Sequence, residues 1–138
     1  MKILNSIDWN FYPMDKIIIL GCNGYTGKYF QEYCFLQGLH DKYRIIGIDN
    51  HETYDSSIET TIFDLLDNEK LEQFIIEEKP DFLINLAGSF SAQDFESLER
   101  INATLSRSLL EIIIKKKLEI HQIKFNKNYS KHFPLIPQ

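Results

Sequence analysis

KIIILGCNGYTG, residues 16–27, is the stretch that decides the fold of this chain. The β-branched run Ile17 to Ile19 leads into a glycine, which is typical of a buried parallel strand. Gly21, Gly24 and Gly27 follow at every third position, and apolar residues at helical spacing come after them. The order of strand, glycine loop and helix predicts a turn that grips the phosphates of a dinucleotide.

Each glycine of the loop has a separate expected role. Gly21 permits the tight turn, Gly24 lets a pyrophosphate approach the backbone, and Gly27 lets the helix pack against the strand. The helix N-terminus offers unpaired N–H groups and a partial positive charge to the phosphates. The spacing is a variant of the plain Gly-x-Gly-x-x-Gly pattern, so three structural turn glycines are the alternative interpretation.

Further strands and helices alternate along the chain. The pattern predicts strands at 16–20, 44–48, 60–63, 82–86 and within 118–125, and helices at 27–38, 69–78 and about 93–116. The first helix should bury Tyr29, Phe30, Tyr33, Cys34 and Leu36, and the last a stripe of Phe95, Leu98, Asn102, Leu105, Leu109 and Ile112. This alternation predicts an α/β fold with a Rossmann-type parallel sheet, helices on both faces, and a ligand crevice at the carboxyl ends of the strands.

The expected organisation is one domain in a chain of 138 residues. Residues 1–15 are interpreted as a leader, 16–125 as the nucleotide-binding domain, and 126–138 as an irregular tail. The sheet is expected to be truncated after about its fifth strand. The chain is long enough for one sizeable core.

Composition excludes several classes of function. The chain is 43% hydrophobic and has no run long enough to cross a bilayer, and its net charge of -5 disfavours nucleic acid as a partner. A basic cluster near the end, with Lys115 to Lys117 at its start, is interpreted as a solvated face. Cys22 and Cys34 lack the spacing of a zinc site or disulfide framework, and no secretion signal is found, so a cytoplasmic location is expected.

Acidic and small residues follow the later strands. Asp49, about twenty residues beyond the glycine loop, can accept hydrogen bonds from both ribose hydroxyls, and its charge would repel a 2′-phosphate, which favours NAD over NADP. Asp64 follows the next strand, where it could reach the adenine or be an ordinary loop carboxylate. Small residues at 86–88 would let the nicotinamide-side ribose and phosphates lie close to the backbone.

These landmarks together resemble the extended short-chain dehydrogenase/reductase family, whose members are NAD(P)-dependent epimerases, dehydratases and reductases of nucleotide sugars. The matching segments are residues 21–27, 48–50, 63–65, 79–88, Asn102 and 109–111, within about 15–118. The resemblance implies that Tyr25 and Thr26 contact the pyrophosphate and that Asn102 supports the site from the long helix, or is satisfied locally. The full implied cofactor set is Gly21, Asn23, Gly24, Tyr25, Thr26, Gly27, Asp49, Asn50, Asp64, Leu65, Leu86, Ala87, Gly88 and Asn102.

The family's acid/base pair is not found in this sequence. The family places Tyr-x-x-x-Lys after the fifth strand, whereas here that spacing occurs only at Tyr12 and Lys16, before the first strand. The leading hypothesis is therefore the cofactor half of a nucleotide-sugar epimerase or dehydratase, inactive alone. A non-catalytic NAD-binding regulatory module and one part of a split enzyme are the alternatives. The resemblance also implies a homodimer, or a complementing fragment, through the helix at about 93–116.

Overall fold

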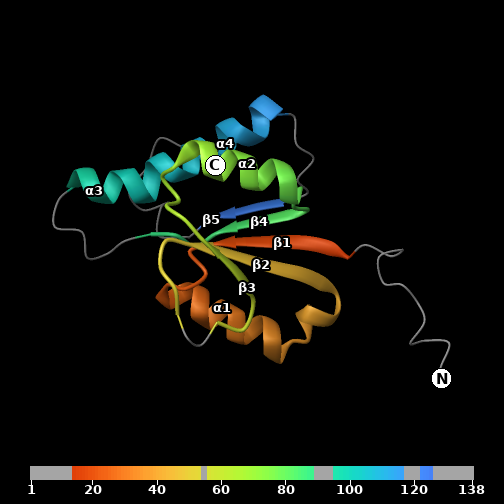
Figure 1. Cartoon of the computed structure of the whole chain (residues 1–138). Helices are drawn as coiled ribbons and strands as arrows, with labels where there is room; N and C mark the ends of the chain where they lie inside the picture. Colours follow the sequence, from red (N-terminus) through yellow and green to blue (C-terminus); the bar gives the residue numbers. More distant parts are fainter. Residues whose placement is uncertain (1–13, 54–55, 89–94, 117–121, 126–138) are drawn as a thin grey trace, which may run out of the picture.

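Five parallel strands form the central sheet in a computed structural model that describes residues 14–53, 56–88, 95–116 and 122–125. They are β1 (Asp15–Leu20), β2 (Tyr43–Asp49), β3 (Glu59–Ile62), β4 (Phe82–Asn85) and β5 (Gln122–Phe125), in the spatial order β3-β2-β1-β4-β5 (Figure 1). The predicted parallel sheet is confirmed. The order runs outward in both directions from β1, so a topological switch point lies between β1 and β4.

Helices cover both faces of this sheet, as the sequence predicts. Helix α1 (Tyr25–Leu36) lies on one face, and α2 (Asn68–Glu78) and α4 (Leu105–Lys116) lie on the other (Figure 1). Three short segments complete the described chain: the 3-10 turn η3 (Leu39–Asp41), helix α3 (Phe95–Glu99) and the π-helical segment η4 (Arg100–Thr104). The predicted leader as far as residue 13 and the tail at 126–138 lie outside the described residues.

The two faces differ in how much apolar surface they bury. Because side chains alternate along a strand, Ile18 and Leu20 of β1 point toward α2 and α4, whereas Ile17 and Ile19 point toward α1. The larger cluster also takes in Leu71 and Ile75 of α2 and three residues of α4, Leu105, Leu109 and Ile112. On the α1 face the helix contributes one buried hydrophobic residue, Cys34, with half-buried Phe30 packed against the same cluster.

Helix α1 buries only part of the predicted set: Cys34 is buried and Phe30 is half-buried, as expected. Tyr29, Tyr33 and Leu36 are exposed, and the side against the sheet instead carries Gly27, Gln31 and Cys34, spaced by four and three residues. Gln31 is satisfied there: its Nε2 donates to the carbonyl of Cys22 at 2.6 Å and its Oε1 accepts from the backbone N–H of Ser57 at 3.2 Å. The prediction was wrong for Tyr29, Tyr33 and Leu36 because a glycine and a glutamine with satisfied hydrogen bonds, neither counted as apolar, make the contact.

The single long helix predicted at about 93–116 is three segments in the structure. Residues 93 and 94 lie outside the described residues, and α3 is followed by the π turn η4, where the N–H of Leu105 bonds to the carbonyl of Arg100. A π turn holds more residues than an α turn. The side chains of α3 therefore face a different direction from the one that a continuous α-helix would give them. Leu105, Leu109 and Ile112 are buried as predicted, but Phe95 is exposed.

Candidate functional site

Two glycines between the end of β1 and the first turns of α1 have no room for a side chain. Gly21 has a φ of +75°, and a Cβ there would lie 2.5 Å from the backbone nitrogen of Ala87, just past β4. At Gly27 a Cβ would lie 2.5 Å from the carbonyl oxygen of Cys22. The predicted tight turn at Gly21 is thus present, while Gly27 packs against the loop itself and not against the strand.

Gly24 differs from the other two glycines because space remains around it. A Cβ there would meet one atom, the carbonyl oxygen of Gly21, at 3.4 Å. Gly24 is the N-cap of α1, with φ -75° and ψ 175°, and makes no side-chain cap. The first turn of α1 contains no acidic residue. The opening N–H groups of α1 therefore lack the usual side-chain acceptor, which leaves a site suited to an anion.

Asp49, at the end of β2, is almost completely buried and holds the glycine loop in place. Its Oδ2 accepts from the backbone N–H of Asn23 at 2.8 Å, and its Oδ1 accepts from the backbone N–H of Asn50 at 2.7 Å. The Nδ1 of His51 lies 3.2 Å from the same Oδ1. The side chain of Asn23 in turn donates to the carbonyl of His51 at 2.7 Å. The loop and the end of β2 are thus one hydrogen-bonded unit.

The end of β4 is shaped by Asn85, a residue the sequence interpretation did not select. Asn85 is fully buried; its Oδ1 accepts from the N–H of Ala87 at 3.1 Å, and its Nδ2 donates to Ser106 of α4 at 3.3 Å. These bonds hold Ala87 beside Gly21 and tie the turn to the helix above it. A buried polar residue at a strand end, two positions before an Ala-Gly pair, was the available signal.

The predicted residues meet in a crevice at the carboxyl ends of the strands, with a volume of about 140 Å³. Those that line it follow four different strands: Gly21, Gly24, Asp49, Asn50, Asp64, Leu65, Leu86, Ala87 and Gly88. The crevice is completed by residues that were not predicted, namely His51, Leu66, Ile101 and Leu105. Five predicted residues do not line it: Asn23, Tyr25, Thr26, Gly27 and Asn102.

Those five residues have distinct positions. Thr26 is exposed in the first turn of α1. Asn23 is buried behind the loop and positions it, and Gly27 is packed against the loop backbone. The side chain of Tyr25 is exposed, with its ring 4.9 Å from that of Tyr29 on the outer side of α1. Asn102 is half-buried in η4, next to Ile101, which does line the crevice. Any contact of Tyr25 with a phosphate in this conformation would come from its backbone.

Asp64 begins a short turn beside the crevice. Its Oδ1 accepts from the N–H of Leu66 at 2.9 Å, and its carbonyl accepts from the N–H of Asp67 at 2.9 Å. The side chain is exposed, while Leu65 is buried in the core. Asp64 thus shapes the loop and also lines the crevice. Its position is compatible both with an ordinary loop carboxylate and with a contact to the adenine.

The thiol of Cys22 lies behind the loop and is not suited to nucleophilic chemistry. Burial, and secondly the charge of Asp49, raise the pKa of Cys22 from 9.0 to about 11. The thiol is therefore neutral at physiological pH, and a neutral thiol is a weak nucleophile. Both cysteines are free and buried. In the part of the chain that the structure describes, no group of three or more His, Cys, Asp or Glu residues could hold a metal ion.

The arrangement fits a dinucleotide. Backbone approach is open at Gly24, N–H donors lie at the start of α1, and a buried carboxylate ends the neighbouring strand. Anions bind at such helix N-termini, and ligands of open parallel sheets bind at the switch point.

None of the helices within the described residues is long and apolar enough to cross a membrane.

Comparisons with known proteins agree with this geometry. The family model described as the NAD dependent epimerase/dehydratase family matches residues 17–135. No curated protein matches the chain. Among solved structures, L-threonine dehydrogenase from Clostridium difficile has a TM-score of 0.64 at 22% identity, with 82% of this chain and 35% of that chain covered. UDP-glucose 4-epimerase from Brucella ovis, in complex with NAD, has a TM-score of 0.64 at 22% identity, with 80% and 35% covered.

A third structure extends the range of activities among the similar proteins. The dTDP-glucose 4,6-dehydratase of Bacillus anthracis, in complex with NAD, has a TM-score of 0.60 at 20% identity, with 80% of this chain and 36% of that chain covered. The chain therefore spans about 35% of the length of the structures it resembles. At these identities the likeness shows the fold.

Proposed function

This chain belongs to the NAD dependent epimerase/dehydratase family, and on that premise we propose that it binds NAD as the cofactor-binding part of a larger oxidoreductase, epimerase or dehydratase. The predicted resemblance to the extended short-chain dehydrogenase/reductase family is confirmed. The observation that carries the proposal is the uncapped N-terminus of α1 beside the buried carboxylate of Asp49. NAD supplies hydride transfer at its nicotinamide ring when bound.

The residues of the chain have separate roles in this proposal. The first-turn N–H groups of α1 and the backbone at Gly24 bind the pyrophosphate. Asp49 faces the adenosine ribose, with Asn50 beside it, and Asp64 and Leu65 face the adenine. Residues 86–88 lie against the central part of the cofactor. Each of these assignments follows the strand-end position of the residue in the crevice.

A preference for NAD over NADP is part of the proposal. Asp49 places a negative charge at the end of β2, and a like charge disfavours a 2′-phosphate. Two backbone N–H groups, those of Asn23 and Asn50, already donate to its two oxygens at 2.8 and 2.7 Å, so the carboxylate is fixed in position before any cofactor arrives. A carboxylate has about four acceptor sites, which leaves capacity for a ribose hydroxyl.

The substrate and catalysis of the whole enzyme stay predictions. The structural relatives include nucleotide-sugar enzymes and an L-threonine dehydrogenase, so a nucleotide-sugar substrate rests on the sequence resemblance. We propose that this chain alone does not catalyse a reaction, because its single Tyr-x-x-x-Lys spacing, Tyr12 to Lys16, ends at the start of β1 and does not follow the fifth strand. The alternatives are a regulatory NAD-binding module and one part of a split enzyme. A cytoplasmic location accords with two free thiols.

The predicted interface at about 93–116 is also carried forward as a proposal. Phe95 of α3 and Ile114 of α4 are strongly exposed, and Leu110 is partly so. Ile114→Glu would place a charge on that surface and should abolish any association through it. Sedimentation of the wild type and this variant tests the interface.

Calorimetric titration of the full chain with NAD and NADP tests the cofactor site. We expect saturable NAD binding, weakened at least about tenfold in Asp49→Ala because both the ribose contact and the hold on Asn23 are lost. Asp67→Ala, which changes a carboxylate outside the crevice, is the matched control and should bind as the wild type does. A folded wild-type chain that binds neither nucleotide would overturn the proposal.

Asp49→Asn tests the cofactor preference separately. Asparagine keeps one oxygen acceptor for the N–H of Asn23 and removes the negative charge. The ratio of NADP affinity to NAD affinity should therefore rise by about tenfold or more. An unchanged ratio would show that the charge of Asp49 does not set the preference, even if NAD binding itself is intact.

A further inference from the structure

His51 differs in charge from the other ionisable residues of the crevice at the strand ends. Within the part of the chain that the structure describes, the ionisable side chains lining this crevice are those of Asp49, His51 and Asp64. Two of the three are carboxylates, and a dinucleotide brings further negative charge. Because histidine gains a proton as the pH falls from about 8 to about 5, His51 is the described lining residue that can become positive.

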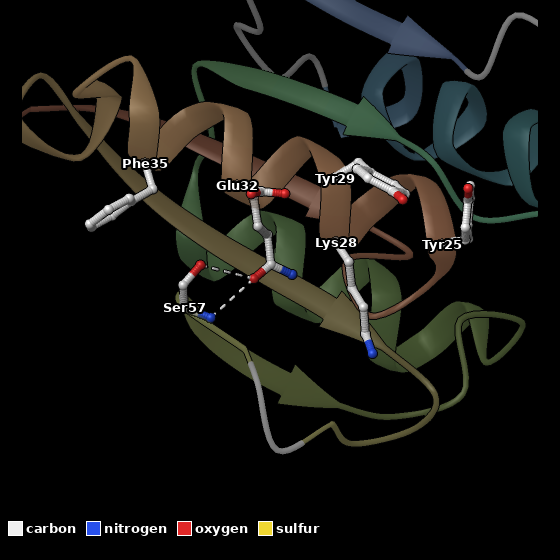
Figure 2. Close-up of a pocket in the computed structure, with 7 residues that line it drawn as sticks. Tyr25, Lys28, Tyr29, Glu32, Phe35 and Ser57 are labelled. Atoms are coloured by element: carbon white, nitrogen blue, oxygen red, sulfur yellow. Dashed lines mark hydrogen bonds between the residues drawn. The ribbon is translucent and has the colours of Figure 1, made fainter.

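The connection between β2 and β3, which carries His51, is held at two points. The side chain of Asn23, in the glycine loop, donates to the carbonyl of His51 at 2.7 Å. Further along the connection, the N–H and the hydroxyl of Ser57 donate to the Oε1 of Gln31 at 3.2 and 3.3 Å, drawn as dashed lines in Figure 2. The first contact fixes His51 relative to the glycine loop, and the second ties the connection to α1.

The imidazole ring of His51 lies against the carboxylate of Asp49. Its Nδ1 is 3.2 Å from the Oδ1 of Asp49 and 2.9 Å from the Oδ1 of Asn50. An ionised carboxylate only accepts hydrogen bonds, so these contacts require the proton on Nδ1 and leave Nε2 to gain or lose one. The side chain of His51 is 59% exposed, whereas that of Asp49 is 5% exposed. A proton or a ligand can therefore reach the ring while it stays in contact with a nearly buried carboxylate.

From this pairing we propose that His51 determines, together with Asp49, the choice between NAD and NADP, and that it does so in a pH-dependent way. The inference rests on the cofactor site proposed above, in which Asp49 faces the adenosine ribose. With His51 neutral, the charge of Asp49 repels a 2′-phosphate, and NAD is preferred. With His51 protonated, the imidazolium pairs with Asp49 and offers a positive charge to the phosphate, so NADP binds more readily.

The distances around Asp49 allow the ring and a 2′-phosphate to interact. A ribose hydroxyl bonded to Asp49 lies about 3 Å from the carboxylate, and the Nδ1 of His51 is 3.2 Å from the same carboxylate. A phosphate on that hydroxyl is therefore on the order of 6 Å or less from the ring, a range in which opposite charges favour each other. By linkage, bound NADP favours the protonated ring, and the affinity for NADP rises as the pH falls.

The other ionisable groups around His51 come from several elements. Asp49 ends β2, Asp64 lines the crevice from the turn after β3, and Glu52 follows His51 in the chain and is exposed. The glycine loop adds the thiol of Cys22, whose pKa burial raises to about 11. The turn after β4 and the η4–α4 region line the crevice with aliphatic residues and glycine. Carboxyl groups ordinarily titrate well below neutral pH, so histidine is the group of this set expected to change charge between about pH 8 and about pH 5.5.

Calorimetric titration of the full chain with NAD and with NADP, at about pH 8 and about pH 5.5, tests the inference. Between these pH values the ratio of NADP affinity to NAD affinity should rise about tenfold more in the wild type than in His51→Gln, which cannot become charged. This comparison is needed because a phosphate monoester itself gains a proton near pH 6, to the same extent with both proteins. His51→Lys, charged at both pH values, should show the high ratio already at pH 8.

A second histidine supplies the matched control, and the ring itself supplies a second readout. His40 lies in η3, before β2, and does not line the crevice. His40→Gln should therefore keep the pH dependence of the wild type, and circular dichroism checks that each variant is folded. In proton NMR, the His51 resonances, identified by their loss in His51→Gln, should titrate at a higher pH with NADP bound than with NAD bound.

Failure of this inference is distinguishable from failure of the cofactor site. If NAD binds and the affinity ratio changes with pH equally in the wild type and His51→Gln, the inference is overturned and the cofactor site stands. A wild-type ratio that does not rise at low pH, or a His51→Lys ratio at pH 8 equal to that of the wild type, leads to the same conclusion. A folded chain that binds neither nucleotide at either pH overturns the cofactor site and the inference together.

Discussion

The N-termini of α1 and α2 lie at the same edge of the sheet, yet their chemistry is opposite. At α2 the N-cap is Asp67, whose side chain accepts from the N–H of Lys70 at 3.2 Å, and Glu69 adds an acidic group to the first turn. At α1 the N-cap is Gly24, and there is neither a side-chain cap nor an acid. A helix whose end is purely structural supplies its own acceptor, whereas one that binds an anion leaves its donors open.

The loops before the two helices also differ in what holds them in place. The loop before α2 shapes itself through Asp64, which bonds to the N–H of Leu66 two residues on. The loop before α1 is held from outside, by Asp49 of β2 through the N–H of Asn23 and by Gln31 through the carbonyl of Cys22. Support from neighbouring elements leaves the inner surface of the loop free for a ligand.

The largest effect should come from removing the close packing of the α1 loop. In Gly27→Ala the new Cβ would lie 2.5 Å from the carbonyl oxygen of Cys22, and the clash cannot be relieved by a side chain because the nearest atoms are all backbone atoms of Gly21 and Cys22. We expect a loss of about 3 kcal/mol or more in the free energy of unfolding, measured by urea denaturation. Gly24→Ala, with its nearest atom at 3.4 Å, should stay within about 1 kcal/mol of the wild type. Equal losses would contradict the assigned packing.

The next effect depends on pH and concerns the thiol buried under the same loop. The folded state holds the proton of Cys22 up to about pH 11, whereas a thiol with a pKa of 9.0 loses it earlier. The unfolded chain is therefore favoured increasingly as the pH rises from about 9 to about 11, by roughly 2 to 3 kcal/mol in all. Denaturation of the wild type and Cys22→Ala across this range measures the difference. If the free energy of unfolding changes with pH in the same way in both proteins, the Cys22 thiol does not contribute to the pH dependence of stability.

Converting the end of α1 into one like α2 should separate binding from stability. Gly24→Asp introduces a cap at a residue whose φ of -75° and ψ of 175° suit one. Its carboxylate would accept from the first-turn N–H groups and repel phosphate, so NAD affinity should fall about ten- to a hundredfold, with stability unchanged or slightly raised. Titration and denaturation of the same sample test this. NAD binding at wild-type strength would mean that the helix end is not the phosphate site.

The smallest effect should come from removing the cap of α2. Asp67→Ala leaves the N–H of Lys70 without its acceptor, and the free energy of unfolding should fall by about 1 kcal/mol. Thermal unfolding in the presence and absence of NAD measures both properties at once. A change in NAD affinity in this variant would show that the N-terminus of α2 also contributes to NAD binding, against the contrast drawn between the two helices.

Much of the fold could be predicted because its signals are local. The β-branched run before Gly21, the glycine spacing and the strand-end Asp49 lie in short stretches whose conformation depends on their own residues. The site residues at strand ends were predicted for the same reason, since parallel strands present their carboxyl ends at one edge. Pro80 ended α2 as expected, with Glu78 the last helical residue.

The sequence by itself determined the strand, loop and helix order, and hence the crevice with Asp49 at its edge. The tertiary structure decided which side of α1 is buried, where the π turn of η4 falls, and that Asn85 and Ser106 join β4 to α4. Those features depend on contacts between residues far apart in the chain. A residue such as Gln31 has no preference for the interior until Cys22 and Ser57 are both in reach, and that meeting is set by packing.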